Sequence, residues 1–128
     1  MACGVKLVAG RPDAVIRIGK NSRLNGASIH AWKNIDCGEG CLFAAGVQIM
    51  DANGHKVSPE TKRTLSKDEP RPVKIGNDVW LGLNVIVLPG SKIGDNVVVG
   101  ANSVISGEIP SNTIVKMAAV DILPLDKR

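Results

Sequence analysis

The chain has 128 residues, a length typical of one domain, and we expect a single domain over residues 1–128. Aromatic residues are rare, with no Tyr, one Phe and two Trp, so the core has to be built from Val, Ile, Leu and Ala. The net charge of +4 is spread along the chain without the stacking aromatics of a nucleic-acid surface, and no stretch approaches a membrane span, so we expect neither nucleic acid nor a membrane as a partner.

The predicted elements begin at Ile18, where aliphatic residues start to recur at every sixth position. Ile18 and Leu24 open the series, the phase then slips by one residue, and the series resumes at Cys37, Phe43 and Ile49. A helix would repeat near 3.6 residues and a half-buried strand at 2. A period of six therefore indicates a short strand followed by a tight turn.

Residues 50–72 break this rhythm. They are polar and charged, and they contain an Asn-Gly pair and three prolines. We expect a loop that is ejected between two coils of the repeat. Long loops within a rigid repeat usually carry function.

The six-residue step is clearest after this loop. It gives six aliphatic residues in succession, which are Ile75, Leu81, Val87, Ile93, Val99 and Ile105. Gly, Asn and Asp cluster between them, and these residues tolerate the backbone angles of tight turns. After Pro110 we expect a short tail that leaves the repeat and folds back on the last coil.

Three strands of this kind make a triangular coil of about eighteen residues, and coils stack by parallel pairing about 4.8 Å apart. The sequence thus predicts an all-β parallel β-helix, with coils over residues 18–30, 37–49, 75–87 and 93–105. The aliphatic residues point into the prism, whose interior we expect to be too narrow for a large aromatic side chain. Cys37 and Cys41 fall at inward positions, and their spacing does not fit a CxxC metal site. An odd count of three cysteines with no apolar leader is typical of a reduced, cytoplasmic protein.

Three segments resemble the hexapeptide acyltransferases, in particular the galactoside, maltose and capsular-sugar O-acetyltransferase branch. They are IRIGKNSRLNG, IMDANGHKV and VKIGNDVWLGLNVIVLPGSKIGDNVVVGANSVISGEI, in chain order. The resemblance implies a left-handed β-helix, an exception to the usual right-handed crossover. It also implies acetyl-CoA as the acyl donor, and a homotrimer with active sites between subunits that acetylates a small-molecule or saccharide acceptor.

The IMDANGHKV segment carries the position of the family's catalytic histidine, which is His55 here. A histidine with an ordinary pKa of about 6.5 can accept the proton of an attacking hydroxyl, which contributes on the order of 10²–10⁴-fold to the rate. Asp51, four residues earlier, is a candidate to hold the imidazole tautomer. The alternative for Asp51 is a turn-forming residue.

Further positions carry family functions over to this chain. Asn25 and Trp80 correspond to residues on the acceptor side, and Trp80 also lies near the thiol end of the cofactor. The expected wall for the pantetheine arm of CoA comprises Gly82, Leu83, Ala101 and Ser106. Lys116 is a candidate to meet the CoA phosphates, and Lys127 with Arg128 is the alternative.

Two departures from the family bear on the expected ligands. The tail VKMAAVDI lacks the family's Gly and Pro and its basic residue for the CoA phosphates. An acidic residue expected near Trp32 and Lys33 is absent, so a simple galactoside is not the expected acceptor. A sugar hydroxyl is favoured, and N-acetylation of an amino sugar stays open.

Two other functions compete with acetyl transfer. One is a non-catalytic or decayed β-helix that acts as a scaffold, which the altered tail favours. The other is a γ-class carbonic anhydrase, which needs three histidines around its metal. The sequence has only His30 and His55, so no metal is expected, and His30 is expected to be structural.

Overall fold

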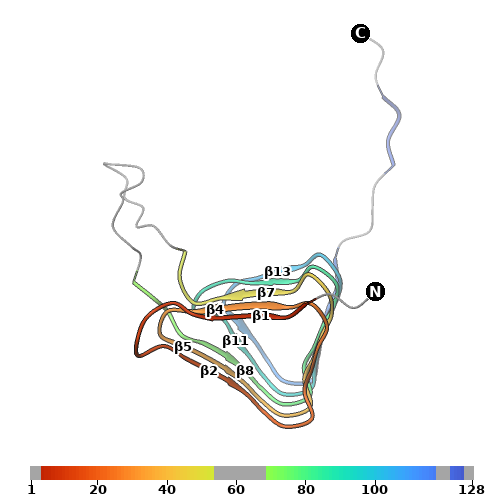
Figure 1. Cartoon of the computed structure of the whole chain (residues 1–128). Helices are drawn as coiled ribbons and strands as arrows, with labels where there is room; N and C mark the ends of the chain where they lie inside the picture. The colour runs from red at the N-terminus through yellow and green to blue at the C-terminus, as the bar shows by residue number, and fades with distance from the viewer. Residues whose placement is uncertain (1–3, 54–68, 118–121, 126–128) are drawn as a thin grey trace.

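The computed structural model describes residues 4–53, 69–117 and 122–125, and every regular element in this part of the chain is a β-strand. The strands are two to four residues long and form three parallel sheets of five strands each. The three sheets are the three sides of a prism with a triangular cross-section (Figure 1).

Each sheet takes every third strand along the chain. Sheet 1 contains β1 (Lys6–Ala9), β4 (Ser28–Ala31), β7 (Gln48–Met50), β10 (Ile86–Val87) and β13 (Val104–Ile105). Sheet 2 contains β2 (Val15–Ile18), β5 (Asn34–Cys37), β8 (Val73–Ile75), β11 (Lys92–Ile93) and β14 (Glu108–Ile109). Sheet 3 contains β3 (Arg23–Leu24), β6 (Leu42–Phe43), β9 (Trp80–Leu81), β12 (Val97–Val99) and β15 (Thr113–Val115). The chain winds through five coils, and we name each corner by the sheets that it joins: corner 1–2, corner 2–3 and corner 3–1.

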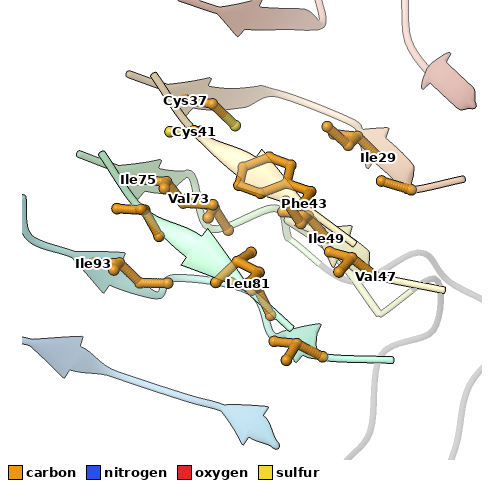
Figure 2. Packing of buried hydrophobic residues seen from close by; sticks show 14 of the residues in the cluster. Ile29, Cys37, Cys41, Phe43, Val47, Ile49, Val73, Ile75, Leu81 and Ile93 are labelled. Carbon is orange, nitrogen blue, oxygen red and sulfur yellow. The ribbon is translucent and has the colours of Figure 1, made fainter. Parts of the chain in front are cut away.

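The strand register aligns the inward side chains into three columns, one on each sheet. The column of sheet 1 is Leu7, Ile29, Ile49, Val87 and Ile105. The column of sheet 2 is Ile18, Cys37, Ile75, Ile93 and Ile109. The column of sheet 3 is Leu24, Phe43, Leu81, Val99 and Val115. The members in the three middle coils are almost fully buried (Figure 2), and each contributes about 1.5–3 kcal/mol by leaving water. The predicted left-handed parallel β-helix and its six-residue step are confirmed.

The expectation that the prism excludes large aromatics is wrong at Phe43. Its side chain is fully buried in the second coil and is in register with Leu24 of the first coil and Leu81 of the third. Figure 2 shows Phe43 among the buried aliphatic side chains. The same coil buries four small side chains, Ala27, Ala31, Cys37 and Cys41. These small residues leave the volume that the phenyl ring fills. Cys37 and Cys41 are both inward, as predicted.

The prediction of four coils is wrong at both ends of the chain. β1 opens a coil before Ile18, and β13, β14 and β15 close a fifth coil that ends at Val115 rather than at Pro110. Both were missed because the step between inward residues is not six there. The residue numbers give eleven positions from Leu7 to Ile18 and four from Ile105 to Ile109.

The predicted phase slip between Leu24 and Cys37 combines two changes of opposite sign. Five positions separate Leu24 from Ile29, where corner 3–1 is tightened at Gly26, which has a φ of +79°. Eight positions separate Ile29 from Cys37, because corner 1–2 gains two residues. The net slip is only one residue, so the sequence pattern does not reveal the two-residue insertion at corner 1–2, next to the loop.

Corner 1–2 is the irregular corner of the prism. The first two coils carry insertions there, and the described residues 51–53 after β7 and 69–72 before β8 lie at the same corner (Figure 1). No strand is assigned to residues 51–53 and 69–72, in agreement with the predicted break in the repeat, and the rest of the predicted loop lies outside the described residues. His55 belongs to this loop but lies outside the described residues.

Candidate functional site

The neck of the loop is closed by main-chain hydrogen bonds. The Arg71 N–H donates to the Asp51 carbonyl at 2.7 Å, and the Arg71 carbonyl accepts from the Gly90 N–H at 2.9 Å. The segments that enter and leave the loop are thus hydrogen-bonded to each other, and the second segment is also hydrogen-bonded to the fourth coil. The loop starts from a fixed base.

The Asp51 side chain is fully buried at this neck and joins two coils. Its Oδ1 accepts from the Trp32 N–H at 2.8 Å, and its Oδ2 accepts from the Lys33 and Asn34 N–H groups at 2.8 and 2.9 Å. Hydrogen bonds to a charged group contribute about 1.5–3 kcal/mol each. Asp51 therefore holds the insertion of the second coil at corner 1–2. Its predicted contact with the His55 imidazole stays a prediction, since His55 is not described.

Trp32, whose main-chain N–H binds Asp51, forms a hydrogen-bonded aromatic pair with His30. The Trp32 Nε1–H donates to His30 Nε2 at 3.1 Å, and the two rings meet edge to face with centroids 6.3 Å apart and planes at 74°. The Arg11 guanidinium carbon lies 5.0 Å from the centre of the Trp32 ring, within the range of a cation–π contact. Because Nε2 accepts this bond, a neutral His30 carries its proton on Nδ1.

Gly10 of the first coil lies directly against the pair. A Cβ at Gly10 would come within 2.6 Å of Trp32 Cδ1 and 3.0 Å of His30 Nε2. The Gly10 N–H donates to the Ala31 carbonyl at 2.7 Å, which fixes this close approach. The first, second and third coils thus hold the two rings together.

A hollow of about 450 Å³ lies on the outer face of sheet 1, beside the pair and the loop neck. Its volume is in the range of small-molecule sites. Its lining comes from the first three coils of sheet 1 and from corner 1–2. The outward side chains that line it are Lys6, Val8, Ser28, His30, Trp32, Gln48, Met50, Ala52 and Asn53.

Most of the residues predicted to bind CoA gather at corner 3–1. Gly82 and Leu83 follow β9, Ala101 follows β12, and Lys116 follows β15 at successive levels of this corner. The levels are in close contact, since a Cβ on Gly82 would lie 2.9 Å from the Ala101 nitrogen. Ser106 does not join them. It follows β13 and lies at corner 1–2, across sheet 1.

The two residues predicted on the acceptor side lie on or beside sheet 3. Trp80 is 51% exposed on the outer face of β9. Asn25 is exposed at corner 3–1 of the first coil, two coils away from Trp80. Two coils correspond to about 10 Å along the prism.

The predicted site residues therefore fall into two groups at opposite edges of sheet 1. Asp51, Ser106 and the loop neck are at corner 1–2, and the expected CoA residues with Asn25 and Trp80 are at or next to corner 3–1. One chain does not bring the two groups together. A site that uses both groups has to combine corners of different chains.

The described residues contain no cluster of three or more His, Cys, Asp or Glu side chains that could hold a metal ion. Cys37 and Cys41 are buried free thiols. Burial raises the pKa of Cys37 from 9.0 to about 12, and the nearby Cys41 and Asp36 add to this shift. Burial also raises the pKa of Cys41, although hydrogen bonds from the Val79 backbone and the Ser22 side chain oppose the shift. Both thiols are packing groups in this fold.

Sequence reasoning missed the pair of His30 and Trp32. A usable signal was present, because residues two apart in an extended segment face the same side, and both residues precede the loop by one coil. The grip of Asp51 on three main-chain N–H groups had no such signal. It depends on the register between the second and third coils.

Comparisons with known proteins agree with this architecture. Residues 72–107 match a family described as bacterial transferase hexapeptide (six repeats). A putative lipopolysaccharide biosynthesis O-acetyl transferase of Escherichia coli K12 is 39% identical over 109 residues, which cover 79% of this chain and 56% of that protein. The galactoside O-acetyltransferase of the same organism is 35% identical over 100 residues, which cover 77% of this chain and 48% of that protein.

A solved structure extends the likeness to three dimensions. The hexapeptide-repeat acetyltransferase of Vibrio cholerae O1 biovar eltor in complex with acetyl-CoA superposes with a TM-score of 0.74 at 28% identity, covering 86% of this chain and 58% of that chain. The chain thus spans about half the length of the curated relatives that it matches. In the described residues, no helix has the length and apolar character needed to cross a bilayer.

Proposed function

Because the chain belongs to the hexapeptide-repeat acyltransferase family, we propose that it transfers the acetyl group of acetyl-CoA to a hydroxyl of a saccharide acceptor, with His55 as general base. The observation that carries this proposal is the similarity to O-acetyltransferases over more than three quarters of the chain. The acetyl-CoA complex of the Vibrio cholerae relative supports the choice of donor.

The chemistry requires one base next to the thioester. The imidazole of His55 takes the hydroxyl proton while the hydroxyl oxygen attacks the acetyl carbonyl, and the C–S bond then breaks to release CoA as its thiol. His55 follows the described Asn53 by two residues, so its Cα is within about 7 Å of the Asn53 Cα by chain length alone. Asn53 lines the hollow on sheet 1, which supports a base at this edge. We propose that Asp51 contributes by fixing the neck and by orienting the imidazole.

The donor is proposed to lie along corner 3–1. The stacked main chain at Gly82, Ala101 and Lys116 offers an extended wall with small side chains, which suits a pantetheine arm. Leu83 adds an apolar contact, and Lys116 offers a cation for a CoA phosphate. Ser106 is proposed to contact the arm from across sheet 1. We assign Trp80 to the acceptor side, near the thiol end of the arm.

We propose a homotrimer whose sites lie between subunits. Corner 3–1 of one chain facing corner 1–2 of the next would join the two groups that one chain keeps apart. An exposed apolar column on sheet 3 supports such packing, since Trp80, Val98 and Ile114 align across adjacent strands and Ile114 is 66% exposed. The outward column of sheet 2 is charged instead, with Arg17, Asp36, Lys74, Lys92 and Glu108. A cyclic trimer is a closed assembly. We place the protein in the cytoplasm, because its buried cysteines are free thiols.

The test of this function is the His55→Ala variant, assayed by release of the CoA thiol from acetyl-CoA across a panel of sugars. We expect kcat to fall about 10²–10⁴-fold, because only the base is removed. Lys74→Ala on the outer face of sheet 2 is the control and should keep full activity. Size-exclusion chromatography should show one trimer for all three proteins. Full activity in His55→Ala would disprove the mechanism, and no transfer by the wild type to any sugar would favour a non-catalytic scaffold.

A further inference from the structure

We propose that the hollow on sheet 1 is an acceptor subsite in which the pair of His30 and Trp32 determines specificity, and that it takes a neutral or anionic saccharide and rejects an amino sugar. This inference rests on the proposed function for its place in the reaction. Its geometry stands on the described residues alone. The first step of the argument is that the pair is held in one arrangement.

Three contacts fix the pair. Asp51 accepts the main-chain N–H of Trp32 from the third coil, Arg11 covers the indole ring, and Gly10 lies against the shared hydrogen bond. An exposed histidine and a half-buried tryptophan would otherwise sample several rotamers and lose entropy on binding a ligand. A pair already held in place binds with less of this loss.

The pair also faces the hollow with defined chemistry. His30 Nε2 is engaged by the indole N–H, so the remaining Nδ1–H of the neutral ring is a hydrogen-bond donor. Ser28 and Gln48 line the same hollow and add hydroxyl and amide groups, while Val8 and Met50 add apolar surface. Aromatic and apolar surface combined with a few polar groups suits an oxygen-rich, ring-shaped ligand.

The charge of the lining residues is the basis for the expected preference for a neutral or anionic saccharide over an amino sugar. Among the described residues that line it, Lys6 carries a formal charge and none is a carboxylate. The buried Asp51 carboxylate lies beside the hollow, but both of its oxygens accept main-chain hydrogen bonds. A carboxylate or phosphate on the acceptor would be attracted to the Lys6 ammonium. The ammonium of an amino sugar would be repelled by it, and none of the described lining residues offers a carboxylate to pair with that ammonium.

The first experiment follows binding by NMR and needs no turnover. The chain has two tryptophans, so two indole N–H signals are expected, and Trp80→Phe assigns them. Galacturonate, galactose and galactosamine have the same ring stereochemistry with a negative, neutral and positive group, and glucuronate, glucose and glucosamine repeat the series. We expect the Trp32 signal to shift at the lowest concentration with the uronate and at the highest with the amino sugar in at least one series. No shift of the Trp32 signal with any of the six sugars would overturn the proposal.

A lysine pair tests the electrostatic step. In Lys6→Met, the preference for the uronate over the neutral sugar should disappear. Lys92→Met is the matched control, because Lys92 is also an exposed lysine on the outer face of a short strand, but on sheet 2. It should keep the wild-type preference. An unchanged preference in Lys6→Met, or an equal loss in Lys92→Met, would contradict the assigned charge step.

Steady-state kinetics tests His30 in the reaction. His30→Phe keeps a flat ring but can neither accept the indole bond nor donate to an acceptor, so we expect the acceptor KM to rise tenfold or more while the acetyl-CoA KM changes less than twofold. His30→Gln retains a donor and an acceptor and should recover part of this loss. A purely structural contribution would lower Tm without this split between the two KM values. If transfer depends on His55 but the acceptor KM is unchanged in His30→Phe, the subsite is wrong and the proposed function stands. If no transfer occurs but the Trp32 signal shifts as predicted, the proposed function fails and the saccharide site stands.

Discussion

At the residue scale, Asp51 shows how a single side chain connects the scaffold with the candidate site. Its carboxylate holds the main chain of Trp32, Lys33 and Asn34, and its carbonyl accepts from the far end of the loop neck at Arg71. One residue thus positions both the wall of the hollow and the base of the loop. We expect substitution of Asp51 to affect stability and acceptor binding together.

Asp51→Asn should lower the free energy of unfolding by about 1–3 kcal/mol, because an amide NH₂ cannot accept all three main-chain bonds and leaves a buried N–H without a partner. Urea denaturation measures this change. Asp13→Asn is the control, since Asp13 is an exposed residue at the same corner and should stay within about 0.5 kcal/mol of the wild type. Equal stability of the two variants would show that the three bonds contribute little.

Cys37 gives a pH dependence with a definite sign. Its pKa is raised from 9.0 to about 12 in the folded chain, so the thiol is protonated in both states below pH 9 and contributes no slope there. Above pH 9 the unfolded chain loses the proton while the folded chain retains it. Stability should therefore fall by up to about 1.4 kcal/mol per pH unit from pH 9 towards pH 12. Urea denaturation of the wild type and Cys37→Ala at pH 8 and pH 10 tests this, and the variant should show a shallower decline.

At the scale of the elements, the corners depend on residues in the left-handed region of φ. Several are Asn or Asp, such as Asn84, Asn96 and Asn102 at φ of +59°, +55° and +64°. Asn and Asp tolerate this region better than other side chains do. Gly46 and Gly107 adopt it as well, at +78° and +92°, but their surroundings differ. A Cβ at Gly46 would collide with the Asn84 side chain, whereas a Cβ at Gly107 would meet open space.

The two glycines share a positive φ and differ in the space around a Cβ, so their alanine variants separate the two effects. Gly107→Ala should cost roughly 1–2 kcal/mol of stability, the penalty of a left-handed backbone alone. Gly46→Ala should cost more, because Asn84 has to move as well. Thermal denaturation of both variants gives the comparison. A larger loss of stability in Gly107→Ala would mean that the Asn84 side chain moves away from residue 46 at little cost.

The elements also show how far the sequence alone leads. Wherever the step between inward residues is six, as from Ile75 to Ile105, the recurrence of aliphatic residues predicts both the strand and the face that is buried. Periodicity loses the strand where a corner is longer or shorter than usual, as before Ile18 and after Ile105. Corner 1–2, which carries the loop neck and borders the hollow, is irregular in this way. The grip of Asp51 on Trp32 was beyond prediction because it joins residues 19 positions apart through the stacking of coils.

At the scale of the whole molecule, stability is concentrated in the middle of the prism. Phe43 is fully buried with a coil on each side, whereas Leu7, in the same kind of inward position in the first coil, is 50% exposed. Each coil contacts only its neighbours, so an end coil lacks half of these contacts. We expect the end coils to open more readily than the middle coils.

Phe43→Ala should therefore cost about 3–5 kcal/mol by leaving a cavity. Leu7→Ala should cost about 1 kcal/mol or less, since half of the side chain is already in water. Calorimetry of the two variants measures the difference, and hydrogen exchange should show greater protection in β6 and β9 than in β1. Similar losses for both substitutions would indicate that the first coil is covered by other contacts.

The irregular corner has a consequence for how such a chain can change. At corner 1–2 the step in residue number from one inward position to the next varies from four (105 to 109) to twenty-six (49 to 75), yet the strands on either side stay in register. The number of residues at this corner can therefore change without altering the register of the strands that support it. Ligand preference could diversify by insertion, deletion or transplantation of segments there while the rest of the protein stays as it is.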